Sequence, residues 1–248
     1  MEEAGAFGLR LISYDRPGYG ESPARPGRIV ADAAGDVRAI AAGLGLSRLA
    51  TWGHSGGGPY ALACAALLPE LVSAACVFAS MVPPDAPGLD FLGSWPAAER
   101  EELALFATQP ERMRELRWSA AQERLPALLS PQGWLELWGE TADSASPERR
   151  AVAEYLALVQ QDTLGRGDQG WWDDNVAYLT PWGFDPASIT VPVQIWHGER
   201  DDAVPPVFGH WLAERIPGAE AHFEADDDHG SIHDRHLAEA FGWLKRQV

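Results

Sequence analysis

Short apolar runs alternate with longer segments of helical periodicity, and this alternation constrains the fold more than any other feature of the chain. The runs are Leu9 to Tyr14, Leu49 to Trp52, Ala74 to Ala79, Val191 to Trp196 and Ala219 to Glu224. Turn-forming Gly, Pro or Asp residues follow most of them, as expected for buried strands. Strands of this kind that alternate with helices are typical of a parallel sheet covered on both faces. The pattern predicts an α/β fold with a mostly parallel sheet and flanking helices.

The segments between the runs have the spacing of helices. From Ala31 to Leu44 the apolar residues recur every three or four positions, and Gly45 follows the last of them. Further helices are expected over Pro59 to Leu68, Pro206 to Ile216 and Ile232 to Lys245.

Residues 83 to 186 interrupt this pattern, because they contain helix-like segments and no convincing strand. Helices are expected over Ala97 to Thr108, Glu111 to Leu129 and Pro147 to Leu164. Seven of the eleven tryptophans fall in this region, and we expect most of them to build a small helical core and one or two to line an apolar pocket. The predicted organisation is a core of residues 1–82 and 187–248 with a helical cap inserted at 83–186.

Composition and charge indicate which binding partners and which cellular location to expect. A chain of 248 residues that is 46% hydrophobic fits one large α/β domain or a domain with a substantial insertion. Its net charge of −17 argues against nucleic acid and anionic membrane as partners, because either would need clustered Lys and Arg. The N-terminus has no basic segment leading into an apolar one and no stretch is long enough to span a membrane, so a cytoplasmic location is expected. Cys64 and Cys76 occupy apolar positions and are expected in the core.

The residues Gly53-His54-Ser55-Gly56-Gly57 lie where an apolar run passes into a helix-like segment. A serine in such a strand-to-helix turn projects its hydroxyl from the sheet, and the glycines two residues to either side give the backbone room to turn. This is the pattern of a nucleophile elbow, with Ser55 as the nucleophile.

A serine hydroxyl needs a base to take its proton and a third group to hold that base. Asp201 follows one predicted strand and His229 follows the next, so both are expected at the same carboxyl edge of the sheet as Ser55. Asp202, the neighbour of Asp201, is an alternative for the acid.

The elbow, the turn from Asp15 to Ser22, the segment from Trp196 to Asp201 and the segment from Asp228 to Gly230 together resemble the α/β-hydrolase fold family. The resemblance runs over nearly the whole chain, and the order Ser55, Asp201, His229 matches the order in that family. It implies that Ser55 is the nucleophile, His229 the general base and later acid, and Asp201 the carboxylate that orients the imidazole. It implies one oxyanion-hole donor in the backbone N–H of Gly56, no cofactor, and a cap over residues 83–186 that shapes substrate choice.

The resemblance predicts a serine hydrolase that cleaves an ester-like or other acyl-type bond of a small molecule through an acyl-enzyme. A second hypothesis is a metal site, since His229, His233 and His236 lie near three consecutive carboxylates, Asp226 to Asp228.

The chain departs from the family at its start, where only one predicted strand, Leu9 to Tyr14, precedes the elbow strand. The family has four strands there, with a His-Gly oxyanion motif after the third. On this basis we expect an N-terminally incomplete α/β-hydrolase fold in which Met1 is an internal start of a longer reading frame. The departure also supports an alternative function, a catalytically impaired or non-catalytic ligand-binding protein on the same scaffold.

Overall fold

A computed structural model of the chain describes residues 2–163 and 167–248. Its strands are β1 (Leu49–His54), β2 (Val72–Phe78), β3 (Val193–Gly198) and β4 (Glu220–Glu224). The α-helices of the described residues are α1 (Glu2–Ala6), α2 (Ala33–Gly43), α3 (Gly57–Leu67), α4 (Ala97–Thr108), α5 (Pro110–Leu128), α6 (Pro131–Leu137), α7 (Pro147–Thr163), α8 (Gln169–Tyr178), α9 (Pro206–Arg215) and α10 (Ser231–Lys245). Short 3-10 helices occupy Val30–Asp32 and Pro186–Ser188.

The four strands form one parallel sheet in the order β1-β2-β3-β4. In register, Trp52 lies opposite Cys76, which lies opposite Gln194 on β3. Because all four strands run the same way, their carboxyl ends meet at one edge of the sheet. The predicted α/β class with a parallel sheet and flanking helices is confirmed.

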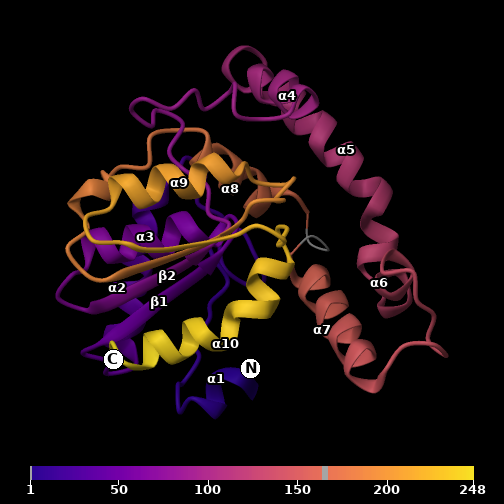
Figure 1. The fold of residues 1–248 in the computed structure, drawn as a ribbon. Helices are drawn as coiled ribbons and strands as arrows, with labels where there is room; N and C mark the ends of the chain where they lie inside the picture. Colours follow the sequence, from indigo (N-terminus) through magenta and orange to yellow (C-terminus); the bar gives the residue numbers. More distant parts are fainter. Residues whose placement is uncertain (1, 164–166) are drawn as a thin grey trace. The chain divides into compact units, whose positions relative to one another are not determined.

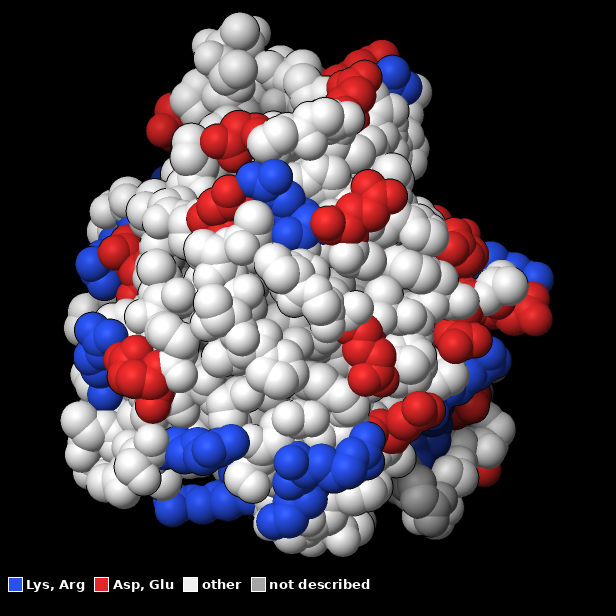
Figure 2. Space-filling model, turned by 60° about the vertical axis from the view of Figure 1, so that its left-hand side comes forward, with Lys and Arg blue, Asp and Glu red and all other residues white. Residues whose placement is uncertain are grey.

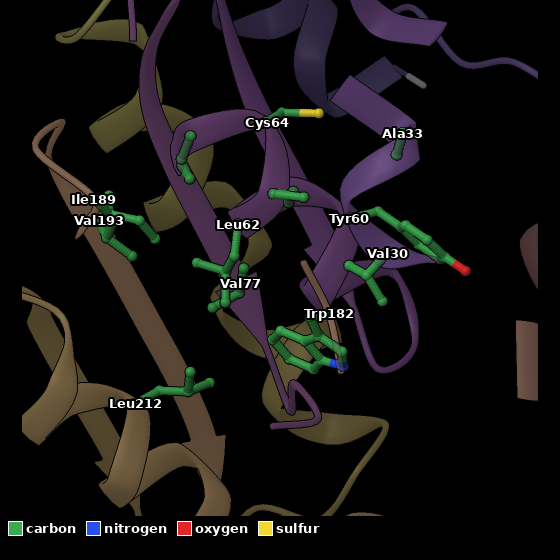
Figure 3. Close-up of a cluster of buried hydrophobic side chains, with 14 of the residues drawn as sticks. Val30, Ala33, Tyr60, Leu62, Cys64, Val77, Trp182, Ile189, Val193 and Leu212 are labelled. Carbon is green, nitrogen blue, oxygen red and sulfur yellow. The ribbon is translucent and has the colours of Figure 1, made fainter. Parts of the chain in front are cut away.

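Side chains of the central strands alternate between two hydrophobic cores, as the period of two in a strand requires. Val77 and Ile195 point into the core that includes residues of α3 and α9, part of which Figure 3 shows. Phe78 and Trp196 point into the other core, which includes residues of α10. Figure 1 shows α10 on the opposite side of the sheet from α3 and α9. Both faces of β2 and β3 are therefore buried, which explains why these strands are nearly continuous apolar runs.

The chain divides into two compact units. The sheet unit comprises residues 1–13, 27–97 and 176–248, and the helical unit comprises residues 14–26 and 98–175. The cap boundaries expected from the sequence, at 82/83 and 186/187, stay a prediction.

The helical unit has its own small core and its own polar contacts. Leu135, Ala145 and Ala153 are buried there, with Trp134 and Trp138 packed against them. Asp174 on α8 is almost fully buried and accepts hydrogen bonds from Arg16 Nη2 at 2.5 Å and Tyr19 Oη at 2.7 Å. The turn from Asp15 to Ser22 is thus tied to α8 within this unit.

The predicted strand over Leu9 to Tyr14 is wrong. This segment has no regular secondary structure, and Leu11 and Ile12 are 44% and 40% exposed. An apolar run becomes a buried strand only when a neighbouring strand and a covering layer are available. In the described residues neither edge of the sheet pairs with this segment. Leu9 packs partly buried against the core that includes residues of α10, whereas Leu11 and Ile12 stay exposed.

Two tryptophans expected in the cap belong to the sheet unit. Trp182 is 1% exposed and lies in the core of α3 and α9, while Trp95 packs beside Phe208 of α9. Most of the others do pack against aromatic or cationic side chains of the helical unit, for example Trp118 against Trp171. Cys64 and Cys76 are both buried and free.

Acidic side chains are scattered over the face of the molecule in Figure 2. Figure 2 shows one face, on which Lys and Arg gather in a few groups, several of them beside Asp or Glu. Arg38 pairs with Glu70 at 2.9 Å, and Arg215 pairs with Asp185 at 2.6 Å. Exposed pairs of this kind contribute only about 0 to 1 kcal/mol each to stability, so this charge pattern contributes little to holding the fold together.

Candidate active site

Ser55 lies in the tight turn between β1 and α3 and has a φ of 54°. A left-handed backbone at a residue with a Cβ costs about 1 to 3 kcal/mol, so the surrounding structure must hold it in place. The Ser55 N–H donates to the carbonyl of Phe78 at 2.8 Å, and the Ser55 carbonyl accepts from Gly58 N at 3.0 Å. The strained turn expected of a nucleophile elbow is present at this serine.

The glycines around Ser55 have different roles. A Cβ on Gly53 would lie 2.3 Å from the carbonyl oxygen of Gly57, and a Cβ on Gly58 would lie 2.2 Å from Ser80 Oγ. A Cβ on Gly57 would meet no atom within 4 Å. Gly53 therefore allows the close backbone approach, as the sequence predicted, whereas Gly57 is not sterically required.

Asp201 follows β3, and its carboxylate is completely buried. Its Oδ1 accepts hydrogen bonds from the N–H groups of Ala203 at 2.9 Å and Val204 at 2.8 Å. Its Oδ2 lies 2.8 Å from Nδ1 of His229 and 3.2 Å from Nε2 of His197. By contrast, Asp202 is exposed, so the contacts favour Asp201 over Asp202 as the acid.

The hydrogen bonds around Asp201 keep it ionised. Burial by itself raises the pKa of this carboxyl, but the hydrogen bonds from His197, His229 and the Val204 backbone outweigh burial. The pKa of Asp201 consequently lies well below its usual range, and the group is an acceptor at neutral pH. An ionised Asp201 requires a proton on His229 Nδ1, which leaves Nε2 of His229 as the basic nitrogen.

The loop that carries His229 is held by its own polar contacts. Asp227 is buried and accepts hydrogen bonds from Ser231 Oγ at 2.9 Å and Arg235 Nη1 at 2.6 Å, and its second oxygen lies 2.9 Å from His236 Nε2. Asp228 accepts from two N–H groups at the start of α10, those of Gly230 and Ser231. His229, the candidate base, thus lies in a loop between β4 and α10 that these hydrogen bonds hold in place.

The histidines of the proposed metal site are directed to different partners. Nδ1 of His229 faces Asp201, His236 faces Asp227, and the ring of His233 packs against Trp52 and Phe78. Within residues 2–163 and 167–248 no group of three or more His, Cys, Asp or Glu side chains is arranged to hold a metal ion.

Three side chains at this edge of the sheet have contacts that sequence patterns did not reveal. His197 is completely buried, and its Nε2 lies 3.1 Å from the Val204 carbonyl, which can only accept, so the proton is on Nε2. Tyr178, at the end of α8, donates from its hydroxyl to the carbonyl of Gly56 at 2.9 Å. His54, next to Ser55, bonds to the carbonyl of His229 through Nε2 at 2.9 Å.

Asp201 and His229 thus form a direct hydrogen bond through their side chains. His54, the residue before Ser55, forms a hydrogen bond with the main chain of His229 and so connects the elbow to the His229 loop. His54 is the last residue of β1, Ser55 follows it, and Asp201 and His229 follow β3 and β4. All four therefore lie at the carboxyl edge of the sheet, where ligands bind in open α/β sheets. Gly56 is the N-cap of α3, so its N–H lies among the unpaired donors of a helix start.

Comparison with known proteins identifies the family. The model for the alpha/beta hydrolase fold matches residues 2–235, and the chain therefore belongs to the α/β-hydrolase fold family. A search of the curated proteins finds no match.

Solved structures with the same fold include several bacterial proteins. An alpha/beta hydrolase fold protein from Nakamurella multipartita is 23% identical, with a TM-score of 0.66 over 99% of this chain and 85% of that one. An esterase from Rhodococcus sp. is 20% identical, with a TM-score of 0.64 over 100% and 85%. A bromoperoxidase from Bacillus anthracis is 20% identical, with a TM-score of 0.67 over 99% and 84%. At these identities the similarity establishes the fold.

Over the part of the chain that the structure describes, no helix combines the length and the apolar character that crossing a bilayer requires.

Proposed function

We propose that this protein is a serine hydrolase that cleaves an ester-like or other acyl-type bond of a small molecule through an acyl-enzyme. The observation that carries the proposal is the hydrogen bond between His229 Nδ1 and Asp201 Oδ2, at 2.8 Å, on the same edge of the sheet as a serine with a strained backbone. An imidazole whose Nδ1 is held by a buried carboxylate is a base prepared to act through Nε2. Esterases among proteins of this fold add support at the level of reaction class.

In the proposed first half-reaction, Ser55 Oγ attacks the carbonyl carbon of the substrate while His229 Nε2 takes the hydroxyl proton. The carbonyl oxygen becomes an oxyanion that accepts a hydrogen bond from the Gly56 N–H. The tetrahedral intermediate collapses, the bond to the leaving group breaks, and His229 returns the proton to that group. Asp201 stays ionised and stabilises the imidazolium that forms between these steps.

In the second half-reaction a water molecule replaces the leaving group. His229 takes a proton from this water as its oxygen attacks the acyl carbon. The second tetrahedral intermediate then expels Ser55 Oγ, which regains its proton from His229. The products are the protonated leaving group, which carries the original proton of Ser55, and the carboxylic acid. Ser55 has regained a proton from the water, and His229 is again neutral, so the enzyme returns to its starting state.

A fluorophosphonate probe tests the proposal, because it reacts covalently with an activated serine. We expect labelling of the wild-type chain, loss of labelling in Ser55→Ala, and strongly slowed labelling in His229→Gln. Ser47→Ala changes an exposed serine just before β1 and serves as the matched control that keeps wild-type labelling. A folded wild-type chain that stays unlabelled would contradict the proposal and favour a non-catalytic ligand-binding protein.

A further inference from the structure

We propose that His54 is a positioning residue that holds the backbone of the base-bearing loop against the nucleophile elbow. This inference rests on the proposed function, since it assigns a role in bringing His229 to Ser55. It uses contacts between residues of the sheet unit alone.

The carrying observation is one hydrogen bond between two distant parts of the chain. His54 Nε2 lies 2.9 Å from the carbonyl oxygen of His229, 175 positions away in sequence. His54 is the last residue of β1 and directly precedes Ser55, so its backbone position is tied to that of the serine. A carbonyl oxygen only accepts, which means that His54 donates and carries its proton on Nε2.

The base is thereby held from two directions. Asp201 fixes the His229 side chain through Nδ1 at 2.8 Å, and His54 fixes the His229 main chain at its carbonyl. The first contact sets the tautomer and the rotation of the imidazole. The second sets how far the loop lies from the elbow, which is the separation that proton transfer between Ser55 and His229 depends on.

The ring of His54 also has a defined packing environment. Its centroid lies 4.8 Å from that of His229 and 4.9 Å from that of His233, with which it stacks at an interplanar angle of 25°. These contacts restrict the rotation of the imidazole, so Nε2 is held in the direction of the loop carbonyl.

His54 fits this role because it stays neutral. Burial lowers its pKa to about 4, more strongly than the hydrogen bond to His229 raises it, and the neighbouring imidazoles of His229 and His233 lower it further. At neutral pH it therefore places no positive charge beside His229, which must itself become positive during the reaction. A charged neighbour at this distance would oppose that step.

The test separates the donor from the ring. His54→Phe keeps an aromatic ring and removes the donor, whereas His54→Gln removes the ring and places an amide N–H near the position of Nε2. His54→Met is a second donor-free variant, matched to Gln in length. His210→Phe replaces a half-exposed histidine on α9 and is the control for loss of an imidazole.

Hydrolysis of p-nitrophenyl acetate and the rate of fluorophosphonate labelling are the readouts, with the thermal midpoint as the measure of folding. We expect kcat to fall about 10- to 100-fold in His54→Phe and His54→Met, with KM within about twofold of wild type. His54→Gln should recover kcat to within about threefold of wild type, and His210→Phe should match wild type. Wild-type kcat in folded His54→Phe, or equal losses in the Gln and Met variants, would overturn the proposal.

A measurement on the wild-type chain covers the case in which the protein does not react with these probes, which would contradict the proposed function itself. Nitrogen-15 spectra of the histidine rings at pH 7 should place His54 in the neutral form with its proton on Nε2. A proton on Nδ1 alone, or a charged ring at that pH, would overturn the positioning role independently of any activity.

Discussion

Substituting Gly53 by Ala tests whether the elbow depends on close backbone packing. The new Cβ would lie 2.3 Å from the carbonyl oxygen of Gly57, 2.5 Å from its carbonyl carbon and 2.8 Å from Gly58 N, whereas ordinary contacts begin at 3.4 Å. All three atoms are backbone, so the turn must open by about 1 Å to relieve the contact. Ser55 lies inside this turn and has to move with it.

The clash and the displacement set the expected losses of stability and of kcat in Gly53→Ala. Overpacking of this kind costs about 1 to 3 kcal/mol, which lowers the thermal midpoint by about 2 to 12 °C for a chain of this size. A shift of about 1 Å at the nucleophile costs about 10²-fold in kcat. Calorimetry and the hydrolysis of p-nitrophenyl acetate measure the two effects on the same preparations.

Gly57→Ala is the matched control. A Cβ on Gly57 meets nothing within 4 Å, and the residue begins helix α3, where alanine is favoured by about 0.5 to 1 kcal/mol over glycine. We expect wild-type kcat and an unchanged or higher thermal midpoint. Wild-type activity and stability in Gly53→Ala, or an equal loss of both in Gly57→Ala, would show that the elbow does not depend on close packing at Gly53.

Three further predictions concern the acid, the pH dependence of stability and Tyr178. Asp201→Asn can keep the hydrogen bonds from the N–H groups of Ala203 and Val204, but it presents an amide to His229, so we expect kcat to fall about 10⁴-fold. Asp202→Asn is the control and should keep kcat near the wild-type value. Comparable losses in both variants would contradict the assignment of Asp201 as the acid. The pKa of His54 is about 4 in the folded chain and 6.5 ordinarily, so as the pH falls the unfolded chain binds this proton first and His54 should lower the free energy of unfolding by up to about 3 kcal/mol between pH 6.5 and 4. Urea unfolding over this range should show a smaller loss of stability in His54→Gln than in wild type. An equal loss in both proteins would contradict the prediction. A Cβ on Gly56 would lie 2.5 Å from Tyr178 Oη, so Gly56→Ala should lower the free energy of unfolding by about 1 to 3 kcal/mol. Adding Tyr178→Leu to this variant should recover part of the lost stability. If the effects of the two substitutions simply add, the two residues do not interact.

Local patterns predicted the elements that lie near the proposed site. The run at Leu49 and the small residues around Ser55 indicated a strand, a turn and a helix, and the structure has β1, the elbow and α3 there. The positions of Asp201 and His229 after consecutive strands indicated a shared edge, and the two side chains do form a hydrogen bond. These inferences succeeded because parallel strands bring their carboxyl ends together whatever the sequence between them.

Sequence reasoning failed where the outcome depended on distant partners. Leu9 to Tyr14 has the composition of a buried strand, but no strand of the described residues pairs with it. Trp182 lies between helical segments in sequence, yet it is buried in the core of the sheet unit. In both cases the local sequence shows that a residue is hydrophobic, but the tertiary structure determines which elements pack against that residue.

The contacts of the supporting side chains could not be predicted for the same reason. His54 contacts a carbonyl 175 positions away, and Tyr178 contacts one 122 positions away. Neither pair of residues is close enough in sequence to form a recognisable motif. The requirement for glycine at 56 likewise comes from the Tyr178 ring and not from the turn itself.

The most direct test of the central claim is the site of covalent modification. The folded chain would be treated with a fluorophosphonate at neutral pH, digested, and mapped by mass spectrometry. We expect a single stoichiometric adduct on Ser55, which is absent in Ser55→Ala and forms far more slowly in His229→Gln. An adduct on another residue, or none on a folded chain, would contradict this claim.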